Sequence, residues 1–137
     1  MKIEGGPYLV TGATGFVGAA VARALLARGA DVRVLARPGN DRRNLHDLDV
    51  SLVEGDLTQS ASLSAALEGC VGLFHVAADY RIWTRDPAGM MQANVEGTRA
   101  ILEAAYRAGI KRAVYTSSVA VLGTDPFGKP ADEDTPV

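Results

Sequence analysis

A glycine-spaced turn near the start of the chain places the tightest limit on how it can fold. The segment from Thr11 to Gly18 reads TGATGFVG and directly follows Tyr8-Leu9-Val10, a run typical of a buried strand. Beyond the turn, apolar residues recur at helical spacing: Phe16, Val17, Ala20, Val21, Ala24 and Leu25. A strand-to-helix turn of this kind lets a ligand's diphosphate approach the backbone and rest on free N–H groups of the helix. The segment therefore predicts nucleotide binding, with a plain glycine-rich turn as the alternative.

Each glycine of the turn has a predicted role. A Cβ at Gly12 or Gly15 would crowd a bound phosphate, and one at Gly18 would push the helix off the sheet. The spacing is G-x-x-G-x-x-G, which differs from the G-x-G-x-x-G dinucleotide fingerprint. The strand before the turn and the helix after it strengthen the prediction beyond what the glycines give alone.

The bulk composition excludes several classes of protein. The chain has 137 residues, of which 47% are apolar, so it can bury the core of one domain. Its net charge is −2 with both signs mixed, and Arg37, Arg42 and Arg43 form too small a cluster for a nucleic-acid surface. No apolar run is long enough to span a bilayer, and the first residues lack the apolar core of a signal peptide.

Two residues with reactive side chains are interpreted as core residues. Cys70 is the single cysteine, so no internal disulfide can form, which fits a reducing environment and predicts a cytoplasmic location. It stands beside Gly69 without a histidine partner and is interpreted as small core filler. His75 lies within an apolar strand pattern and is interpreted as a core histidine with satisfied hydrogen bonds rather than a base.

Strand and helix patterns alternate along the chain. Strands are predicted at 7–12, 31–36, 50–53, 71–76 and 113–117. Helices are predicted at 15–28, 41–47, 60–68 and 86–108. The alternation implies an α/β fold, a Rossmann-like doubly wound parallel sheet of about five strands in the order 3-2-1-4-5, with helices on both faces. Residues 1–123 would form this dinucleotide-binding domain, and residues 124–137 a loop.

Particular residues mark the helix ends. Glycines stand where three helices should stop: Gly29, Gly69 and Gly109. Ser60 is predicted to cap the helix that follows it, and Asp86-Pro87 provides an N-cap with a favoured first residue. Gly97, inside the longest predicted helix, indicates close contact with another backbone.

The end of the second predicted strand bears on the choice of dinucleotide. A carboxylate there would accept hydrogen bonds from a ribose 2′-hydroxyl, whereas an arginine accommodates a 2′-phosphate. The strand ends Leu35-Ala36-Arg37, and a guanidinium presents a planar fork of donors that suits phosphate. Arg37 therefore favours NADP over NAD, with a merely solvated arginine as the alternative.

Several motifs keep their order along nearly the whole chain: TGATGFVG, VEGDL, HVAA, NVEGT and YTSS. Together they resemble the extended short-chain dehydrogenase/reductases of the NAD-dependent epimerase/dehydratase superfamily, and within these the dihydroflavonol 4-reductase-like branch. The stretches VRVLARPGNDRRNLHDLDVSLVEGDL, LFHVAADYRIW and ANVEGTR look most similar to hopanoid-associated sugar epimerases. The resemblance implies an NAD(P)-dependent oxidoreductase or epimerase that acts by hydride transfer on a sugar-nucleotide or a small carbonyl or hydroxyl substrate.

The resemblance also implies cofactor contacts. Asp56 and the backbone N–H of Leu57 would read the adenine edge, and the small residues Ala77 and Ala78 would let the ribose lie on the backbone. A helix-capping role is the alternative for Asp56. The other residues expected to bind the cofactor are Gly12, Thr14, Gly15, Phe16, Val17, Gly18, Arg37, Asn94 and Ser117.

Substrate contacts are implied later in the chain. A hydroxyl after the fifth strand would hydrogen-bond the substrate oxygen at the reacting carbon. Counting back from Gly123 gives this catalytic role to Ser118, with Ser117 as the near alternative and a turn-capping serine pair as the simpler interpretation. Asn94 would lie beneath the active site and organise it, or would be a surface helix residue. Three residues would lie toward the substrate: Tyr80, Arg81 and Trp83.

The family's Tyr-x-x-x-Lys pair is absent from these 137 residues. Its tyrosine is the acid/base, and its lysine lowers the tyrosine pKa. Four residues beyond Tyr8, Tyr80, Tyr106 and Tyr115 stand, in order, Gly12, Thr84, Ile110 and Val119. We therefore expect the chain to stop before the catalytic helix and substrate lobe and to be inactive alone.

The expected partners follow from this interpretation. They are a nicotinamide dinucleotide, NADP or alternatively NAD, and a small-molecule substrate in the full-length protein. No metal, nucleic-acid or transmembrane partner is expected. Strand five would be left as an exposed edge, which invites homo-oligomerisation. A non-catalytic dinucleotide-binding or regulatory module is the alternative function.

Overall fold

The computed structural model describes residues 5–125 and 127–136. In this part of the chain, the strands form one five-stranded sheet, in which all neighbours run parallel in the order β3-β2-β1-β4-β5. The predicted fold and strand order are confirmed. The strands are β1 (Tyr8–Thr11), β2 (Val32–Ala36), β3 (Ser51–Glu54), β4 (Gly72–His75) and β5 (Ala113–Tyr115).

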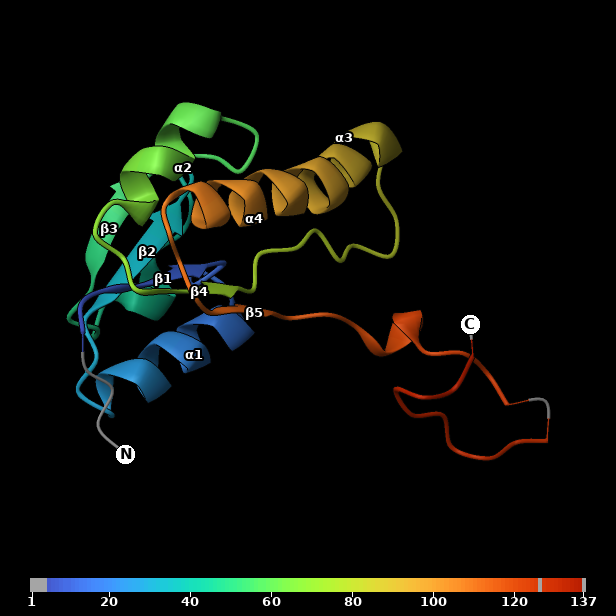
Figure 1. Cartoon of the computed structure of the whole chain (residues 1–137). Helices are drawn as coiled ribbons and strands as arrows, with labels where there is room; N and C mark the ends of the chain where they lie inside the picture. Colours follow the sequence, from blue (N-terminus) through green and yellow to red (C-terminus); the bar gives the residue numbers. More distant parts are fainter. Residues whose placement is uncertain (1–4, 126, 137) are drawn as a thin grey trace.

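Helices cover both faces of the sheet. Figure 1 shows α1 on one face, and α2 and α4 on the other. None of the helices in the described residues is long and apolar enough to cross a membrane. The α-helices are α1 (Phe16–Leu26), α2 (Ser60–Leu67), α3 (Pro87–Met91) and α4 (Gly97–Arg107). The other helical turns are the 3-10 turns η1 (Arg43–Leu45) and η3 (Val119–Val121) and the π-turn η2 (Gln92–Glu96).

Different hydrophobic clusters cover the two faces of the central strand β1. Val10 packs in a cluster with Leu25 of α1, whereas Leu9 packs with Leu63 of α2 and Ile101 of α4. Alternate residues of a strand point to opposite faces, so a strand covered on both sides must be apolar throughout. Leu9 and Val10 are both completely buried, which explains the continuous apolar run before the glycine turn.

The predicted helix ends are largely as observed. Asp86 caps α3, because its carboxylate accepts from the N–H of Gly89 at 2.9 Å and Pro87 is the first helical residue. Three helices end at glycines with positive φ, the conformation that glycine adopts most readily: Gly29 after α1, Gly69 after α2 and Gly109 after α4.

The predicted cap of α2 is wrong. Ser60 is the first helical residue, and Gln59 before it holds an extended backbone without a capping side chain. Ser62 closes this entry instead: its Oγ lies 2.8 Å from the Gln59 carbonyl and accepts from the N–H of Asp56 at 3.1 Å. Serine can bond backbone groups on either side of a helix start, so its presence near a boundary does not fix which serine is used.

The predicted helix at 86–108 is helical from Pro87 to Arg107 but changes type midway. Residues 92–96 form a π-turn, a wider turn that occurs frequently at functional sites. The backbone contact predicted for Gly97 is also corrected: a Cβ there would lie 3.0 Å from the Cβ of Leu57, so the close neighbour is a side chain.

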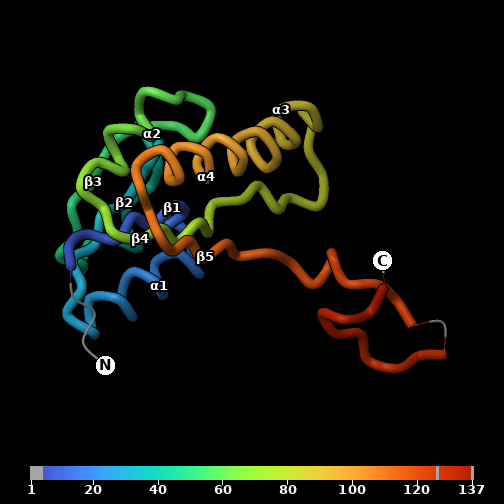
Figure 2. The backbone as a smooth tube through the Cα atoms, in the orientation of Figure 1, coloured from blue at the N-terminus to red at the C-terminus, as the bar shows by residue number. Residues whose placement is uncertain are grey.

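Four further predictions need adjustment or lie partly outside the described residues. The short helix predicted at 41–47 is only the 3-10 turn η1, and β5 is shorter than predicted. After β5 the chain runs away from the sheet, as Figure 2 shows. The predicted domain 1–123 includes residues 1–4, and the predicted loop 124–137 includes residues 126 and 137; these six residues are outside the described ranges.

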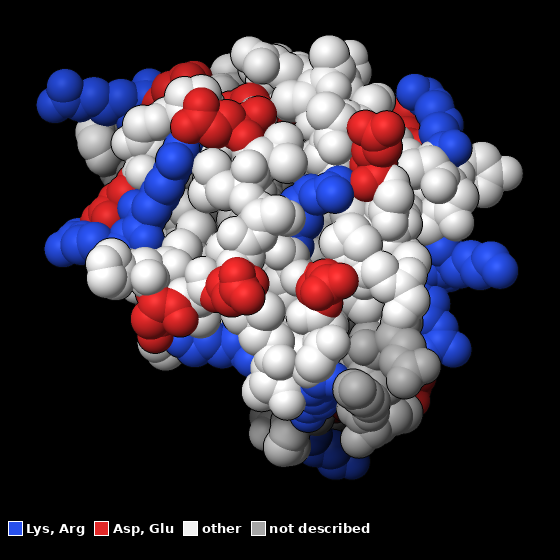
Figure 3. Space-filling model, turned by 90° about the vertical axis from the view of Figure 1, so that its left-hand side faces the viewer, with Lys and Arg blue, Asp and Glu red and all other residues white. Residues whose placement is uncertain are grey.

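The surface carries no dominant charge on the face shown in Figure 3, where acidic and basic side chains are interspersed.

At the edge of the sheet opposite β3, every residue of β5 is exposed, with Val114 and Tyr115 each about half accessible. The described residues therefore leave the outer side of β5 uncovered, as the sequence predicts.

Candidate functional site

Parallel strands bring the predicted site residues to one edge of the sheet. The chain passes outward from β1 to β2 and β3, then returns to the other side of β1 as β4. Open α/β sheets bind ligands beyond the carboxyl ends of their strands, at such a reversal. The residues found there are the glycine turn after β1, Arg37 after β2, Asp56 after β3, Ala77 and Ala78 after β4, and Ser117 and Ser118 after β5.

Gly12 is required by the protein's own backbone. Its φ is +74°, and a Cβ would lie 2.6 Å from the backbone nitrogen of Ala77. No side chain fits in that space, because the segment leaving β4 packs directly on the turn after β1. This contact adds a reason for Gly12 that differs from the predicted crowding of a phosphate.

Gly18 lets α1 pack on the same turn. A Cβ there would lie 2.2 Å from the carbonyl oxygen of Gly12 and 2.8 Å from the Cα of Ala13. The helix thus rests on the turn, whereas the sequence predicts contact with the sheet. Gly15 has an extended backbone as the N-cap of α1, and a Cβ there would lie 3.3 Å from the Gly12 carbonyl.

The N-terminus of α1 presents free hydrogen-bond donors. The N–H of Gly15 donates to the Gly12 carbonyl at 3.0 Å, and the first helical bond runs from Ala19 to Gly15. Within the described ranges, the N–H groups of Phe16, Val17 and Gly18 donate to no acceptor. Phe16 is 88% exposed, and the first turn contains no acidic residue. Free N–H donors and the positive end of a helix dipole favour negative charge at such a position.

A neighbouring segment braces this turn. The amide of Asn44 donates to the carbonyl of Thr14 at 2.7 Å, and Arg23 of α1 pairs with Asp47 at 2.7 Å. The 3-10 turn η1 therefore holds the outer side of the glycine turn. Thr14, a predicted cofactor residue, contributes its carbonyl to this brace.

Arg37 and Asp56 lie near each other beyond β2 and β3. Arg37 is exposed, and Asp56 is half-buried, with its Oδ1 accepting from the N–H and Oγ1 of Thr58 at 2.8 and 2.7 Å. Burial alone would raise the pKa of Asp56, but the bonds from Thr58 and the charge of Arg37 outweigh it and hold that pKa below its ordinary value. Asp56 bonds the residue two positions on, ahead of α2, so the helix-cap alternative does not describe it.

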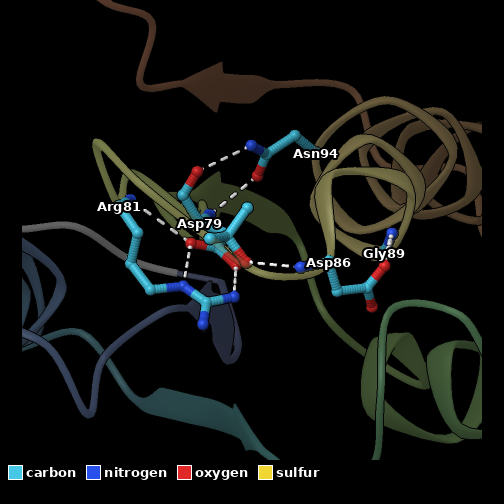
Figure 4. Close-up of polar contacts among 6 residues, drawn as sticks. Asp79, Arg81, Asp86, Gly89 and Asn94 are labelled. Atoms are coloured by element: carbon cyan, nitrogen blue, oxygen red, sulfur yellow. Dashed lines mark hydrogen bonds and ion pairs between the residues drawn. The ribbon is translucent and has the colours of Figure 1, made fainter.

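Asn94 is fixed by the backbone of Asp79. Its Oδ1 accepts from the Asp79 N–H and its Nδ2 donates to the Asp79 carbonyl, both at 2.7 Å (Figure 4). Asn94 lies within the π-turn η2 and is half-buried, so the surface-residue alternative is wrong. The side chain of Asp79 forms an ion pair with Arg81, and this hydrogen bond lowers the pKa of Asp79. Asn94 thus holds the backbone of Asp79 and Arg81 holds its side chain, which fixes the start of the loop after β4.

The serines after β5 are both exposed. Ser118 is the N-cap of η3, and its Oγ accepts from the N–H of Ala120 at 3.2 Å. The simpler interpretation as a turn cap therefore holds for Ser118, whose hydroxyl proton is still able to donate. In the loop after β4, Tyr80, Arg81 and Trp83 are exposed, and the Arg85 guanidinium lies 6.0 Å from the centre of the Trp83 ring.

The comparison with protein families decides the relationship. The model for the "NAD dependent epimerase/dehydratase family" matches residues 8–137. The chain belongs to this family. A Synechocystis sp. protein named as a dihydroflavonol 4-reductase is 48% identical over 126 residues. The match covers 92% of this chain and 36% of that protein.

Two solved structures are similar to this chain in fold and sequence. The crystal structure of gox2253 is 53% identical, with a TM-score of 0.90 over 98% of this chain and 40% of that one. A short-chain dehydrogenase/reductase superfamily protein from Agrobacterium tumefaciens, solved with bound NAD, is 37% identical, with a TM-score of 0.72 over 84% of this chain and 33% of that one. The chain spans between 36% and 40% of the length of the curated relatives it matches.

The sequence patterns do not show the structural contacts of four polar residues next to the site. Thr11 precedes the turn, and its Oγ1 accepts from the N–H groups of Val76 and Ala77, each at 3.2 Å. His75 is completely buried with both ring nitrogens bonded, which confirms the core interpretation. Thr98 and Asn44 act through contacts distant in sequence, which local patterns do not contain. A polar residue within an apolar strand is the one available sign, and it applies to Thr11 and His75.

Proposed function

We propose that this chain is the NADP(H)-binding part of an extended short-chain dehydrogenase/reductase. The observation that carries the proposal is the group of free N–H donors of Phe16, Val17 and Gly18 at the reversal between β1 and β4. A dinucleotide diphosphate fits this position, because donors and helix dipole both favour negative charge. The turn residues Gly12, Thr14 and Gly15 complete the proposed diphosphate site.

The remaining roles follow the order of the strands. Asp56 and Leu57 would contact adenine, and Ala77 and Ala78 the ribose. Asn94 would hold the floor of the site through Asp79, a role supported by its paired hydrogen bonds. Ser118, or alternatively Ser117, would donate to the substrate oxygen.

The proposed substrate class comes from the family. When bound, the cofactor supplies hydride transfer to or from a carbon that carries oxygen. The substrate would be a sugar-nucleotide or a small carbonyl or hydroxyl compound, as for a hopanoid-associated sugar epimerase or a dihydroflavonol reductase. Residues 1–123 would form the binding domain and residues 124–137 the loop leading on, in a cytoplasmic protein. Without a Tyr-x-x-x-Lys pair in its 137 residues, this chain would bind cofactor without turnover.

The preference for NADP rests on Arg37. No carboxylate ends β2, and the exposed guanidinium is available to a 2′-phosphate. Arg37→Ala should weaken NADPH binding by about tenfold, the effect of losing one charge-assisted contact, and leave NADH binding nearly unchanged. Titration calorimetry with both nucleotides measures the ratio. Arg28→Ala, which removes the same charge at the far end of α1, is the control. An unchanged affinity ratio in Arg37→Ala would contradict the assignment to NADP.

A second candidate is a dinucleotide-binding module without catalysis. The glycine turn TGATGFVG, Asp56 and Ser118 fit this module as well as the enzyme. Sequencing the coding DNA beyond Val137 separates the candidates: a following Tyr-x-x-x-Lys on a helical pattern supports the enzyme, and a continuation without it supports the module.

A further inference from the structure

Two polar residues, Thr11 and His75, are completely buried in the described residues. They are register partners on the adjacent strands β1 and β4. The Oγ1 of Thr11 lies 2.7 Å from His75 Nδ1, and His75 Nε2 lies 2.9 Å from the Oγ1 of Thr98 on α4. Burying polar groups is costly unless they are hydrogen-bonded, and this hydroxyl–imidazole–hydroxyl chain bonds all of them.

The hydrogen bonds determine where the ring proton lies. A hydroxyl has one donor and two acceptor positions. Thr11 Oγ1 already accepts from the N–H groups of Val76 and Ala77, so its own proton must point to His75 Nδ1. Nδ1 is then an acceptor, and the neutral ring carries its proton on Nε2, where it donates to Thr98.

This chain connects α4 to the backbone around the glycine turn. Thr11 immediately precedes Gly12. Its Oγ1 accepts hydrogen bonds from the N–H groups of Val76 and Ala77, the first residues of the segment that leaves β4. That segment contacts Gly12 directly, since a Cβ on Gly12 would lie 2.6 Å from Ala77. The ring of Tyr115 on β5 stacks on His75, with ring centres 5.4 Å apart and planes 17° apart. Residues of β1, β5 and α4 thus fix the orientation of the His75 ring. Through Thr11, the ring is linked to both chain segments, the one that leaves β1 and the one that leaves β4.

We propose that His75 is a positioning residue for the dinucleotide site: through Thr11 it sets the spacing of the chain segments leaving β1 and β4, and Thr98 fixes the ring for this role. This proposal rests on the proposed dinucleotide binding. The positioning role of His75 differs from a purely structural one in two ways. It requires one tautomer of the ring, and it makes cofactor affinity depend on the hydroxyl of Thr98 on α4.

The first test is the tautomer itself. A long-range ¹H–¹⁵N correlation spectrum of the ¹⁵N-labelled chain at pH 7 should show His75 protonated on Nε2 and unprotonated on Nδ1. The exposed His46 provides an internal comparison. A His75 signal with the proton on Nδ1, or averaged between both nitrogens, would overturn the proposal. This readout does not depend on any bound nucleotide.

The second test is cofactor affinity in variants of Thr98. Thr98→Val keeps the shape of the side chain and removes the acceptor, so the NADPH dissociation constant should rise by about fivefold, the effect of one lost hydrogen bond. Thr98→Ser keeps the hydroxyl and should bind like the parent chain. Ser64→Ala removes a hydroxyl from the exposed side of α2 and should change nothing.

The outcomes separate this proposal from the function on which it rests. If the chain binds NADPH and Thr98→Val binds equally well, positioning by His75 is wrong and the proposed function stands. If the parent chain binds neither NADPH nor NADH although the Nε2–H tautomer is present, the proposed function fails and the positioning role fails with it. Melting temperatures of all variants identify any loss of affinity that is only a loss of folding.

Discussion

Gly12 combines two constraints that can be separated by experiment. Its φ of +74° disfavours any side chain, and the backbone of Ala77 occupies the place of a Cβ. Gly39 has a similar φ of +76° with no atom within 4 Å of the Cβ position. Gly39→Ala should therefore lower the free energy of unfolding by about 1 kcal/mol, and Gly12→Ala by about 3 kcal/mol or more. Urea denaturation measures both, and equal losses would contradict the packing of the two segments.

His75 makes stability depend on pH. Burial lowers its pKa to about 4, whereas an unfolded histidine titrates near its ordinary value of 6.5. Between these values the unfolded chain binds more protons, so the stabilisation is present above pH 6.5 and is lost as the pH falls. The free energy of unfolding should decrease by about 2 kcal/mol from pH 7 to pH 5 through this residue.

Denaturation of the parent chain and of His75→Gln at several pH values measures this contribution. The variant lacks the titrating ring and should lose the corresponding slope between pH 7 and pH 5. Equal slopes in the two proteins would show that His75 is accessible to protons in the folded state.

At the level of elements, Arg33 links β2 to the end of α2. Its Nη1 donates to the carbonyls of Ala66 and Glu68 at 3.0 and 2.6 Å, where the helix has unpaired acceptors and a negative dipole end. Arg33→Met keeps the apolar stem and removes these bonds, and should lower the free energy of unfolding by about 1.5 kcal/mol. Arg28→Met, which removes a single exposed bond from beyond the end of α1 to the Ala24 carbonyl, should cost less than about 0.5 kcal/mol. Similar losses in both variants would contradict the capping role.

The elements that were predictable from sequence are those whose signals are local. Strands covered on both faces give apolar runs, and the glycines after α1, α2 and α4 mark their ends. The π-turn was not predictable, because its residues follow an ordinary helical pattern and only the pairing of Asn94 with Asp79 shows its use. The cap of α2 was misassigned because Ser62 bonds across the turn.

At the scale of the whole molecule, the site edge was predictable because a parallel sheet places all strand ends together. The support beneath it was not. Thr11, His75 and Thr98 meet across β1, β4 and α4, and their sequence separations of 64 and 23 residues leave no local pattern. Each of the three lies within a motif, TGATGFVG, HVAA or NVEGT, but their contact with one another depends on the fold.

The exposed edge of the sheet is the main whole-molecule feature outside the site. β5 pairs only with β4 among the described residues, and Val114 and Tyr115 are each about half exposed. Unpaired strand edges favour association with another chain. Binding measurements on the isolated chain therefore need its oligomeric state determined at the same concentration.

The most direct test of the account is a calorimetric titration of the 137-residue chain with NADPH. We predict saturable binding at one site per chain, weakened in a folded Gly18→Ala variant, in which the new Cβ displaces the α1 donors from the turn. The absence of binding of both NADPH and NADH by the folded chain would contradict the central claim, that the glycine turn and the N-terminus of α1 form a dinucleotide site.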